Sequence, residues 1–292
     1  MTTPRHRPAE MMAEVASLFH LIGGMGSRHL TLIGGMAPPL LVPEAASSHR
    51  GSGDIDFSIS VAFTKGETAR YYHSLQEHLA PYFEPAEAGF RWRKREGAPG
   101  IPLLVDFMGP EIEATQVDDG TLVPEDDKAG ENLGPTLRPL PLRAADVVDA
   151  DAIIERMDGV HLVYKPGARA SVDIRRTGPV GFLASKAEAL DTRDESKDGY
   201  DLAWWCLNAD PDPTVVAGQV IERDAFRHEY FPESVAILMR AFEAPDFVGP
   251  TGFAEEEIED EGPGDQAFEE ARNRAFLAMS KLLEALRASL WD

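Results

Sequence analysis

The positions of the strand-length apolar runs along the sequence restrict the possible folds of this chain more than any other feature. Short β-rich runs at residues 29–33, 55–63 and 101–108 all lie in its first part, and each has the length and composition of a strand. Apolar residues at helical spacing precede these runs at residues 9–21 and dominate after residue 180. This order predicts an α+β protein, with a small mixed β-sheet core flanked by helices and then a mainly helical C-terminal domain.

A polar connection separates the two parts. Residues 90–95 alternate in part and turn residues follow them, so together with residues 101–108 they predict a hairpin. Residues 109–141 are polar and contain several Gly and Pro, which is typical of an irregular surface connection. We therefore expect a first domain at residues 1–135 and a second at residues 136–292.

The remaining elements are expected from local periodicity. Short strands are predicted at residues 160–164 and 170–174, an acidic loop at residues 255–261, and helices at residues 68–79, 145–157, 182–193, 197–208, 214–223, 232–242 and 265–291.

Charge is the unusual part of the composition. The chain has 50 acidic and 28 basic residues, an excess of 22 negative charges. Such a field repels nucleic acid at long range, whereas it tolerates a cationic small molecule or a metal–nucleotide complex. The same composition also suits a solvated acidic surface that aids solubility.

Several classes of protein are disfavoured. No apolar run reaches the length of a membrane span and the first ten residues lack an apolar signal core, so we expect a cytoplasmic protein without membrane contact. The single cysteine, Cys206, excludes an internal disulfide framework and a cysteine-based zinc site.

A pair of aspartates is the strongest chemical feature. Asp54 and Asp56 stand two residues apart at the start of a predicted strand, and side chains at that spacing face the same side. Two adjacent carboxylates repel each other unless a cation lies between them. A divalent metal ion would supply that cation.

Asp106 is the expected third ligand. It interrupts the apolar run at residues 101–108, and a charge inside such a strand is costly without a partner. Three carboxylates can hold Mg²⁺ or Mn²⁺ bridging a nucleoside triphosphate, polarise its α-phosphate and help to deprotonate an attacking hydroxyl.

A glycine turn precedes the aspartates. Gly34 and Gly35 end the run at residues 29–33, and glycine lets backbone N–H groups approach phosphate oxygens closely. Arg50 and Ser52 stand just before the aspartate pair. The pattern is typical of a phosphate-binding loop followed by a metal site.

Four segments together resemble a known family. Ile33-Gly-Gly-Met-Ala37 and Arg50-Gly-Ser-Gly-Asp-Ile-Asp-Phe57 resemble the first motif of the DNA polymerase β-like nucleotidyltransferase superfamily. Within it, Lys186-Ala-Glu-Ala-Leu190 and Arg193-Asp-Glu-Ser-Lys-Asp-Gly-Tyr-Asp-Leu202 resemble the AbiEii/AbiGii group of toxin-type, MenT-like enzymes. The resemblance spans residues 33–202.

The resemblance implies an enzyme that transfers a nucleoside monophosphate from an NTP to a hydroxyl. Residues 1–135 would be the nucleotidyltransferase core, and the domain at residues 136–292 would complete the nucleotide site. The implied metal ligands are Asp54, Asp56 and Asp106. The implied nucleotide-binding residues are Gly34, Gly35, Ser52, Lys186, Lys197, Asp198 and Asp201, with Lys186 also catalytic. The resemblance also implies a tRNA 3′ end as acceptor and a cognate antitoxin as partner.

Two features keep alternatives open. The family often has a hydroxyl residue after the glycine pair, where this chain has Met36, so a non-catalytic binding or regulatory protein on a degenerate transferase fold is one alternative. The acidic charge supports another, transfer to a cationic small molecule such as an aminoglycoside. A dense basic cluster, residues 91–95 with Trp92 interleaved, suits either RNA contact or a charged hairpin edge.

Overall fold

The computed structural model describes residues 5–45, 47–60, 67–87, 89–110, 114–116, 122–124, 137–193, 196–258 and 264–291. The chain forms two compact units: Met1–Met36 with Arg50–Thr177, and Ala37–His49 with Gly178–Asp292. We call them the sheet unit and the helical unit. The boundary predicted between residues 135 and 136 lies outside the described residues, and the division into residues 1–135 and 136–292 stays a prediction.

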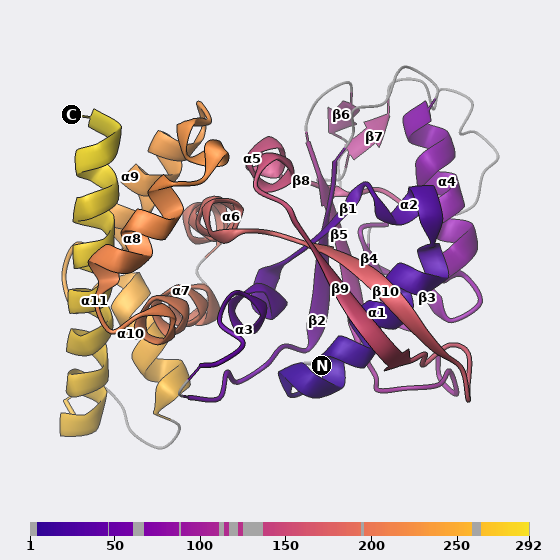
Figure 1. The fold of residues 1–292 in the computed structure, drawn as a ribbon, viewed down its shortest axis with the longest axis horizontal. Helices are drawn as coiled ribbons and strands as arrows, with labels where there is room; N and C mark the ends of the chain where they lie inside the picture. The colour runs from indigo at the N-terminus through magenta and orange to yellow at the C-terminus, as the bar shows by residue number, and fades with distance from the viewer. Residues whose placement is uncertain are drawn as a thin grey trace. The chain divides into compact units, whose positions relative to one another are not determined.

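An eight-stranded mixed sheet forms the centre of the sheet unit (Figure 1). Its order is β3-β4-β5-β2-β1-β10-β9, with β8 also paired to β5. The β2–β5, β1–β10 and β5–β8 pairs are parallel and the others are antiparallel. The strands are β1 (Leu30–Ile33), β2 (Asp54–Ile59), β3 (Phe83–Glu87), β4 (Arg91–Lys94), β5 (Leu104–Gly109), β8 (Leu140–Pro141), β9 (Ile153–His161) and β10 (Arg169–Arg176). A separate pair, β6 (Ala114–Gln116) and β7 (Leu122–Pro124), is antiparallel.

The central strands β1, β2 and β5 are almost entirely buried because both of their faces are covered. Helix α1 (Pro8–Ile22) packs on β9 and β10, α4 (Glu67–Leu79) packs on α1, and α5 (Ala145–Ala150) packs on β2. The ring of Phe57 meets Phe19 edge to face at 5.6 Å and stacks on Phe107 at 5.9 Å. This aromatic core fixes β2 against β5.

In the described part of the helical unit there are helices and no strands. They are α3 (Ala37–Leu41), α6 (Pro179–Thr192), α7 (Ser196–Ala209), α8 (Pro213–Ile221), α9 (Phe231–Ala241), α10 (Val248–Glu257) and α11 (Gln266–Trp291). Helix α11 packs on α7, α8, α9 and α10, because one stripe of its apolar residues is buried, including Phe268, Met279 and Leu282. The predicted fold class, a mixed sheet flanked by helices and followed by helices, is confirmed.

One predicted helix is wrong. Residues 145–157 do not form a single helix, because α5 ends at Ala150 and β9 begins at Ile153. Exposed and half-buried side chains alternate along the first part of β9, which is the period of a strand rather than a helix.

Several elements were not predicted, and two of them, β3 (Phe83–Glu87) and α10 (Val248–Glu257), have a clear local reason. Strand β3 contains Pro85 and lies at the edge of the sheet, where the missing N–H is tolerated. Helix α10 contains Gly249, Pro250 and Gly252, which lower helix propensity. It also takes in the first three residues of the predicted acidic loop, whereas residues 259–261, like residues 61–63 of the predicted second strand, lie outside the described residues.

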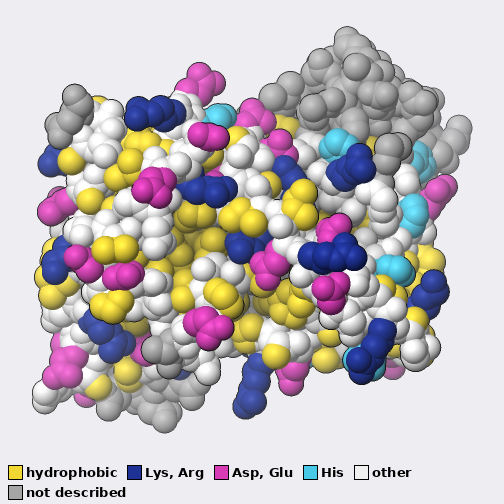
Figure 2. Space-filling view, in the orientation of Figure 1, with side chains coloured by type: hydrophobic (Ala, Val, Ile, Leu, Met, Phe, Trp, Pro, Cys, Tyr) yellow, Lys and Arg dark blue, Asp and Glu magenta, His cyan; other side chains and the backbone are white. Residues whose placement is uncertain are grey.

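Two surface properties follow from these elements. Among the described residues, no helix combines the length and the apolar character that crossing a membrane requires. On the face drawn in Figure 2, acidic side chains are scattered among basic ones. The net charge of −22 is therefore not gathered into one patch on that face.

Candidate functional site

Three carboxylates meet in the sheet unit. Strands β2 and β5 run parallel, with Asp56 opposite Asp106 and Asp54 opposite Leu104. One carboxylate oxygen from each of Asp54, Asp56 and Asp106 lies within 4.8 Å of the other two. Asp56 is 8% exposed and Asp106 is 3% exposed. The structure thus brings together the three residues that the sequence proposed as metal ligands.

Gly34 closes one side of this cluster. Its φ of 69° lies in the left-handed region, and a Cβ atom added to it would lie 1.8 Å from Oδ2 of Asp56. The antiparallel pairing of Ile33 with Asp56 produces this close approach. Only glycine fits both the backbone conformation and the space. Gly35 and Met36 are buried beside it, in a single 3₁₀ turn.

Ser52 holds Asp54. Its hydroxyl donates a hydrogen bond of 2.5 Å to Oδ1 of Asp54, and its side chain is buried. The carbonyl of Ser52 in turn accepts from the backbone N–H of His6 at 2.9 Å. Ser52 therefore orients a carboxylate of the cluster, and its predicted contact with phosphate stays a prediction.

Arg91 is the partner that the burial of Asp106 demands. Its Nε donates to Oδ1 of Asp106 at 2.9 Å, and its Nη2 donates to Oδ2 at 2.6 Å. This forked pairing satisfies both oxygens of the carboxylate. The sequence placed Arg91 in the basic cluster and did not connect it with Asp106, because the connection depends on the register of β4 against β5.

The other cations of that cluster also have acidic partners. Arg93 and Arg95 both pair with Glu84, and the Lys94 ammonium lies 2.6 Å from Oε1 of Glu14. Lys94 is buried, and burial lowers its pKa although Glu14 opposes the shift. Each basic residue of the cluster is therefore paired with an acidic side chain of the sheet unit, although only the Lys94–Glu14 pair is fully buried.

The donor set at the three aspartates fits a hard divalent cation. Carboxylate oxygens are preferred ligands of Mg²⁺ and Mn²⁺, and three of them bring −3 against the +1 of Arg91. The closeness of Gly34 to Asp56 and the bond from Ser52 to Asp54 hold two of the carboxylates in place. These three acidic residues could hold a metal ion.

The helical unit contains a separate buried ion cluster. The Lys186 Nζ lies 2.7 Å from Oδ1 of Asp198 and 2.5 Å from Oδ2 of Asp201. Arg193 pairs with Asp198 at 3.0 Å, and the His49 Nε2 lies 3.0 Å from Oδ1 of Asp201. The side chain of Lys186 is 3% exposed. Three of the predicted nucleotide-binding residues thus form one network between α6 and α7.

The pKa values of this cluster describe tightly held charges. Burial alone would lower the pKa of Lys186, but Asp198 and Asp201 outweigh it and raise the pKa above its ordinary value. Burial would likewise raise the pKa of each aspartate, and the neighbouring cations, Lys186 above all, lower it instead. All three groups stay ionised near neutral pH.

Lys197 and His49 complete the picture of the helical unit. Lys197 is half-buried in the first turn of α7. His49 was not predicted, because it lies in a segment without periodicity. Its ring packs on Tyr200 and Trp204, with centroids 5.2 Å and 4.8 Å away. His49 therefore anchors residues 37–49 within the helical unit, directly before Arg50 of the aspartate motif.

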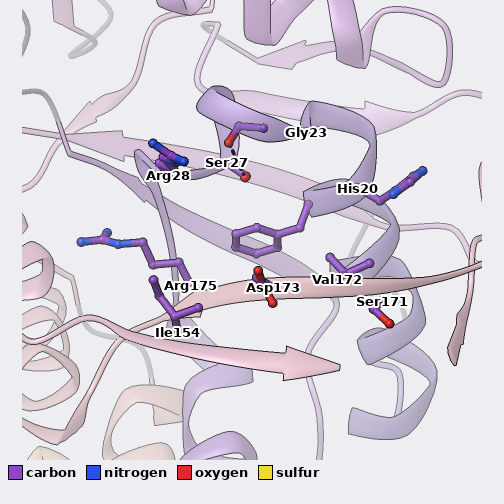
Figure 3. Close-up of a pocket in the computed structure, with 11 residues that line it drawn as sticks. His20, Gly23, Ser27, Arg28, Ile154, Ser171, Val172, Asp173 and Arg175 are labelled. Atoms are coloured by element: carbon purple, nitrogen blue, oxygen red, sulfur yellow. Dashed lines mark hydrogen bonds between the residues drawn. The ribbon is translucent and has the colours of Figure 1, made fainter. Parts of the chain in front are cut away.

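A groove elsewhere in the sheet unit is distinct from the aspartates. It has a volume of about 720 Å³ and lies between the α1–α2 region and strands β9 and β10 (α2, Gly24–Ser27). Figure 3 shows Arg28, Asp173 and Arg175 around it. Arg175 is already bonded to the side chains of Thr31 and Asp149. None of the three clustered aspartates lines this groove.

Comparison with known proteins gives distant likenesses only. No protein-family model matches the chain, and no curated protein matches it. An antigenic nucleotidyltransferase-like protein from Paracoccidioides brasiliensis is 16% identical with a TM-score of 0.42, over 83% of this chain and 92% of that one. The JHP933 protein from Helicobacter pylori is 10% identical with a TM-score of 0.42, over 96% and 93%.

A third solved structure is the CdnC:HORMA-deltaN complex of E. coli MS115-1. It is 11% identical with a TM-score of 0.29, over 99% of this chain and 88% of that one. Because all three TM-scores lie below 0.5, we base no functional argument on these likenesses. The resemblance to the AbiEii/AbiGii group stays a prediction from the motifs.

Proposed function

We propose that this protein is a metal-dependent nucleotidyltransferase, which moves a nucleoside monophosphate from an NTP to a hydroxyl acceptor and releases pyrophosphate. The arrangement of Asp54, Asp56 and Asp106 carries the proposal. Carboxylates from two adjacent parallel strands converge within 4.8 Å, and a glycine at positive φ leaves room for one of them. A purely structural Asp-x-Asp turn would need neither Asp106 nor Gly34.

The reaction would proceed by in-line displacement at the α-phosphorus. The acceptor oxygen forms the new P–O bond, the bond from the α-phosphorus to the bridging oxygen breaks, and the proton of the hydroxyl passes to a carboxylate or to water. A bound Mg²⁺ or Mn²⁺ would polarise the α-phosphate and stabilise the charge on the leaving pyrophosphate. Ser52 orients Asp54, and Gly34 sets the position of Asp56.

The lysines would serve different purposes. Because Lys186 is buried and already bonded to Asp198 and Asp201, we propose that it positions α6 against α7 rather than touching the nucleotide. Lys197 is half-buried and keeps its proposed role as the cation on the triphosphate, where a lysine acts as a point charge. Gly35 keeps its proposed place in the phosphate loop.

The acceptor separates two versions of the function. The motifs favour tRNA, with a toxin role and an antitoxin as partner. The net charge of −22 and the pairing of Arg93, Lys94 and Arg95 with acids favour a cationic small molecule, such as an aminoglycoside, as second candidate. The pairing matters because basic side chains that already pair with acidic ones offer less net positive charge to an RNA backbone.

A labelling experiment tests the function and its acceptor together. The protein is incubated with each α-labelled NTP and Mg²⁺, with and without EDTA, in the presence of total tRNA or an aminoglycoside panel. We expect label on one acceptor, lost in EDTA and in Asp56→Asn. Asp173→Asn, an exposed aspartate of the same unit, is the matched control and should retain activity. No transfer to either acceptor, with no nucleotide binding, would favour the non-catalytic alternative.

A further inference from the structure

Arg91 is bonded directly to Asp106, one of the three carboxylates that could hold a metal ion. The two residues stand opposite each other in the antiparallel β4–β5 pair, and the guanidinium contacts both carboxylate oxygens at 2.6–3.2 Å. The Asp106 side chain is 5% exposed and that of Arg91 is 29% exposed. The pair is therefore shielded on the aspartate side and open to solvent on the arginine side.

The forked contact engages both oxygens through which Asp106 could bind a metal ion. A carboxylate offers about four lone-pair sites on its two oxygens, and Nε and Nη2 of Arg91 engage both of these oxygens. Asp106 is also one of the three carboxylates within 4.8 Å. An ion at the aspartates must share Asp106 with the guanidinium or displace it.

Charge makes the competition stronger. The two neighbouring cations on β4, Arg93 and Lys94, form ion pairs with Glu84 and Glu14, whereas Arg91 pairs with Asp106 of the aspartate cluster. Counting only Arg91 and the three aspartates in their ionised forms, the net charge is −2 with Arg91 and −3 without it. A divalent ion is attracted more strongly to the second charge state.

We propose that Arg91 is a built-in competitor of the metal ion and sets the metal affinity of the free protein. This inference rests on the proposed function, since it requires a metal site at Asp54, Asp56 and Asp106. Arg91 touches a ligand of the metal rather than the reacting atoms, so it is a positioning and affinity-setting residue. We therefore expect that removing the charge of Arg91 strengthens binding of the metal ion.

The expected size follows from Coulomb's law. A divalent ion and a guanidinium roughly 6 Å apart, screened by a water-like dielectric of about 80, repel each other enough to weaken binding about tenfold. Stronger effects are expected if the local dielectric is lower. The water-like value is the conservative choice because the Arg91 side chain is 29% exposed.

The test is a Mn²⁺ titration without nucleotide, followed by electron paramagnetic resonance of free Mn²⁺. We expect Arg91→Gln and Arg91→Met to bind Mn²⁺ about tenfold more tightly than the wild-type protein. Arg91→Lys, which keeps the charge, should stay within about threefold. Arg93→Met removes the same charge two residues along β4 and should change the affinity less than about twofold, because its charge is exposed and screened. Circular dichroism confirms that each variant is folded.

The outcomes separate the two claims. Equal or weaker Mn²⁺ binding in folded Arg91→Gln and Arg91→Met, with binding abolished by Asp56→Asn, would overturn the role of Arg91 and leave the metal site intact. Wild-type protein that binds no Mn²⁺, or Asp56→Asn that binds it unchanged, would overturn both.

Discussion

Replacing Gly34 by alanine perturbs the candidate site at one defined contact. The residue has a φ of 69°, and a left-handed conformation costs a residue with a Cβ about 1–2 kcal/mol. The new methyl would also lie 1.8 Å from Oδ2 and 2.6 Å from Cγ of Asp56, so the carboxylate must move by more than an ångström. Forced repacking of this kind costs about 1–3 kcal/mol. Gly34→Ala should therefore lose about 2–5 kcal/mol of unfolding free energy.

Gly97 provides a matched control for this substitution. It belongs to the same unit and has a φ of 79°, but a Cβ there would meet nothing within 4 Å. Gly97→Ala should show only the backbone cost, about 1–2 kcal/mol, and unchanged Mn²⁺ affinity. Denaturant unfolding measures the loss of stability in each variant, and Mn²⁺ titration measures the change in metal affinity. Gly34→Ala with wild-type Mn²⁺ affinity would refute the reasoning, because it would mean that the position of Asp56 does not govern the site.

Two further predictions concern the ion cluster of the helical unit. Lys186→Met leaves Asp198 and Asp201 buried without their main counter-charge, and it should lower the free energy of unfolding by about 3–5 kcal/mol. The control Lys281→Met, at an exposed position of α11, should lower it by less than about 0.5 kcal/mol. Equal losses of the two variants in denaturant unfolding would contradict a stabilising role of the cluster. Because the native pKa values of Asp198 and Asp201 lie below the ordinary 3.8, their stabilisation is present above about pH 4 and lost as the pH falls through the native values. The free energy of unfolding should therefore fall more between pH 6 and pH 3 for the wild type than for Lys186→Met. An equal fall in the two proteins would argue against this stabilisation by the ion cluster.

The aspartate cluster was predictable because its geometry follows from strand periodicity. Asp54 and Asp56 share a face at any register, and a buried Asp106 in a strand needs a partner nearby. The sequence could not show that Arg91 is that partner. Its pairing with Asp106 depends on the register of β4 against β5, which no local pattern encodes.

Three residues of the ion cluster in the helical unit were named from the sequence, but their burial together between two helices was not predicted. The resemblance to the AbiEii/AbiGii group singled out Lys186, Asp198 and Asp201. A lysine at helical spacing looks the same whether it faces solvent or another helix, so its burial against α7 depends on tertiary packing. His49 carried no signal at all, because a loop residue has no periodic neighbours by which to judge its environment.

Errors in the fold have similar causes. The predicted helix at residues 145–157 continued a helical pattern past Ala150, where an edge strand begins instead. Helix α10 was missed because its glycines disfavour a helix locally, yet they permit close packing. A Cβ on Gly252 would lie 2.4 Å from the carbonyl oxygen of Ser196 on α7.

The central claim is that Asp54, Asp56 and Asp106 support metal-dependent nucleotidyl transfer. The most direct measurement is pyrophosphate release from NTP in the presence of Mg²⁺ and the acceptor identified by labelling, compared between wild type, Asp54→Asn and Asp56→Asn. We expect release from the wild type that is abolished by EDTA and reduced at least about a thousandfold in each variant, as for loss of a residue on which the chemistry depends. Release that persists in folded Asp56→Asn or in EDTA would contradict the proposed function.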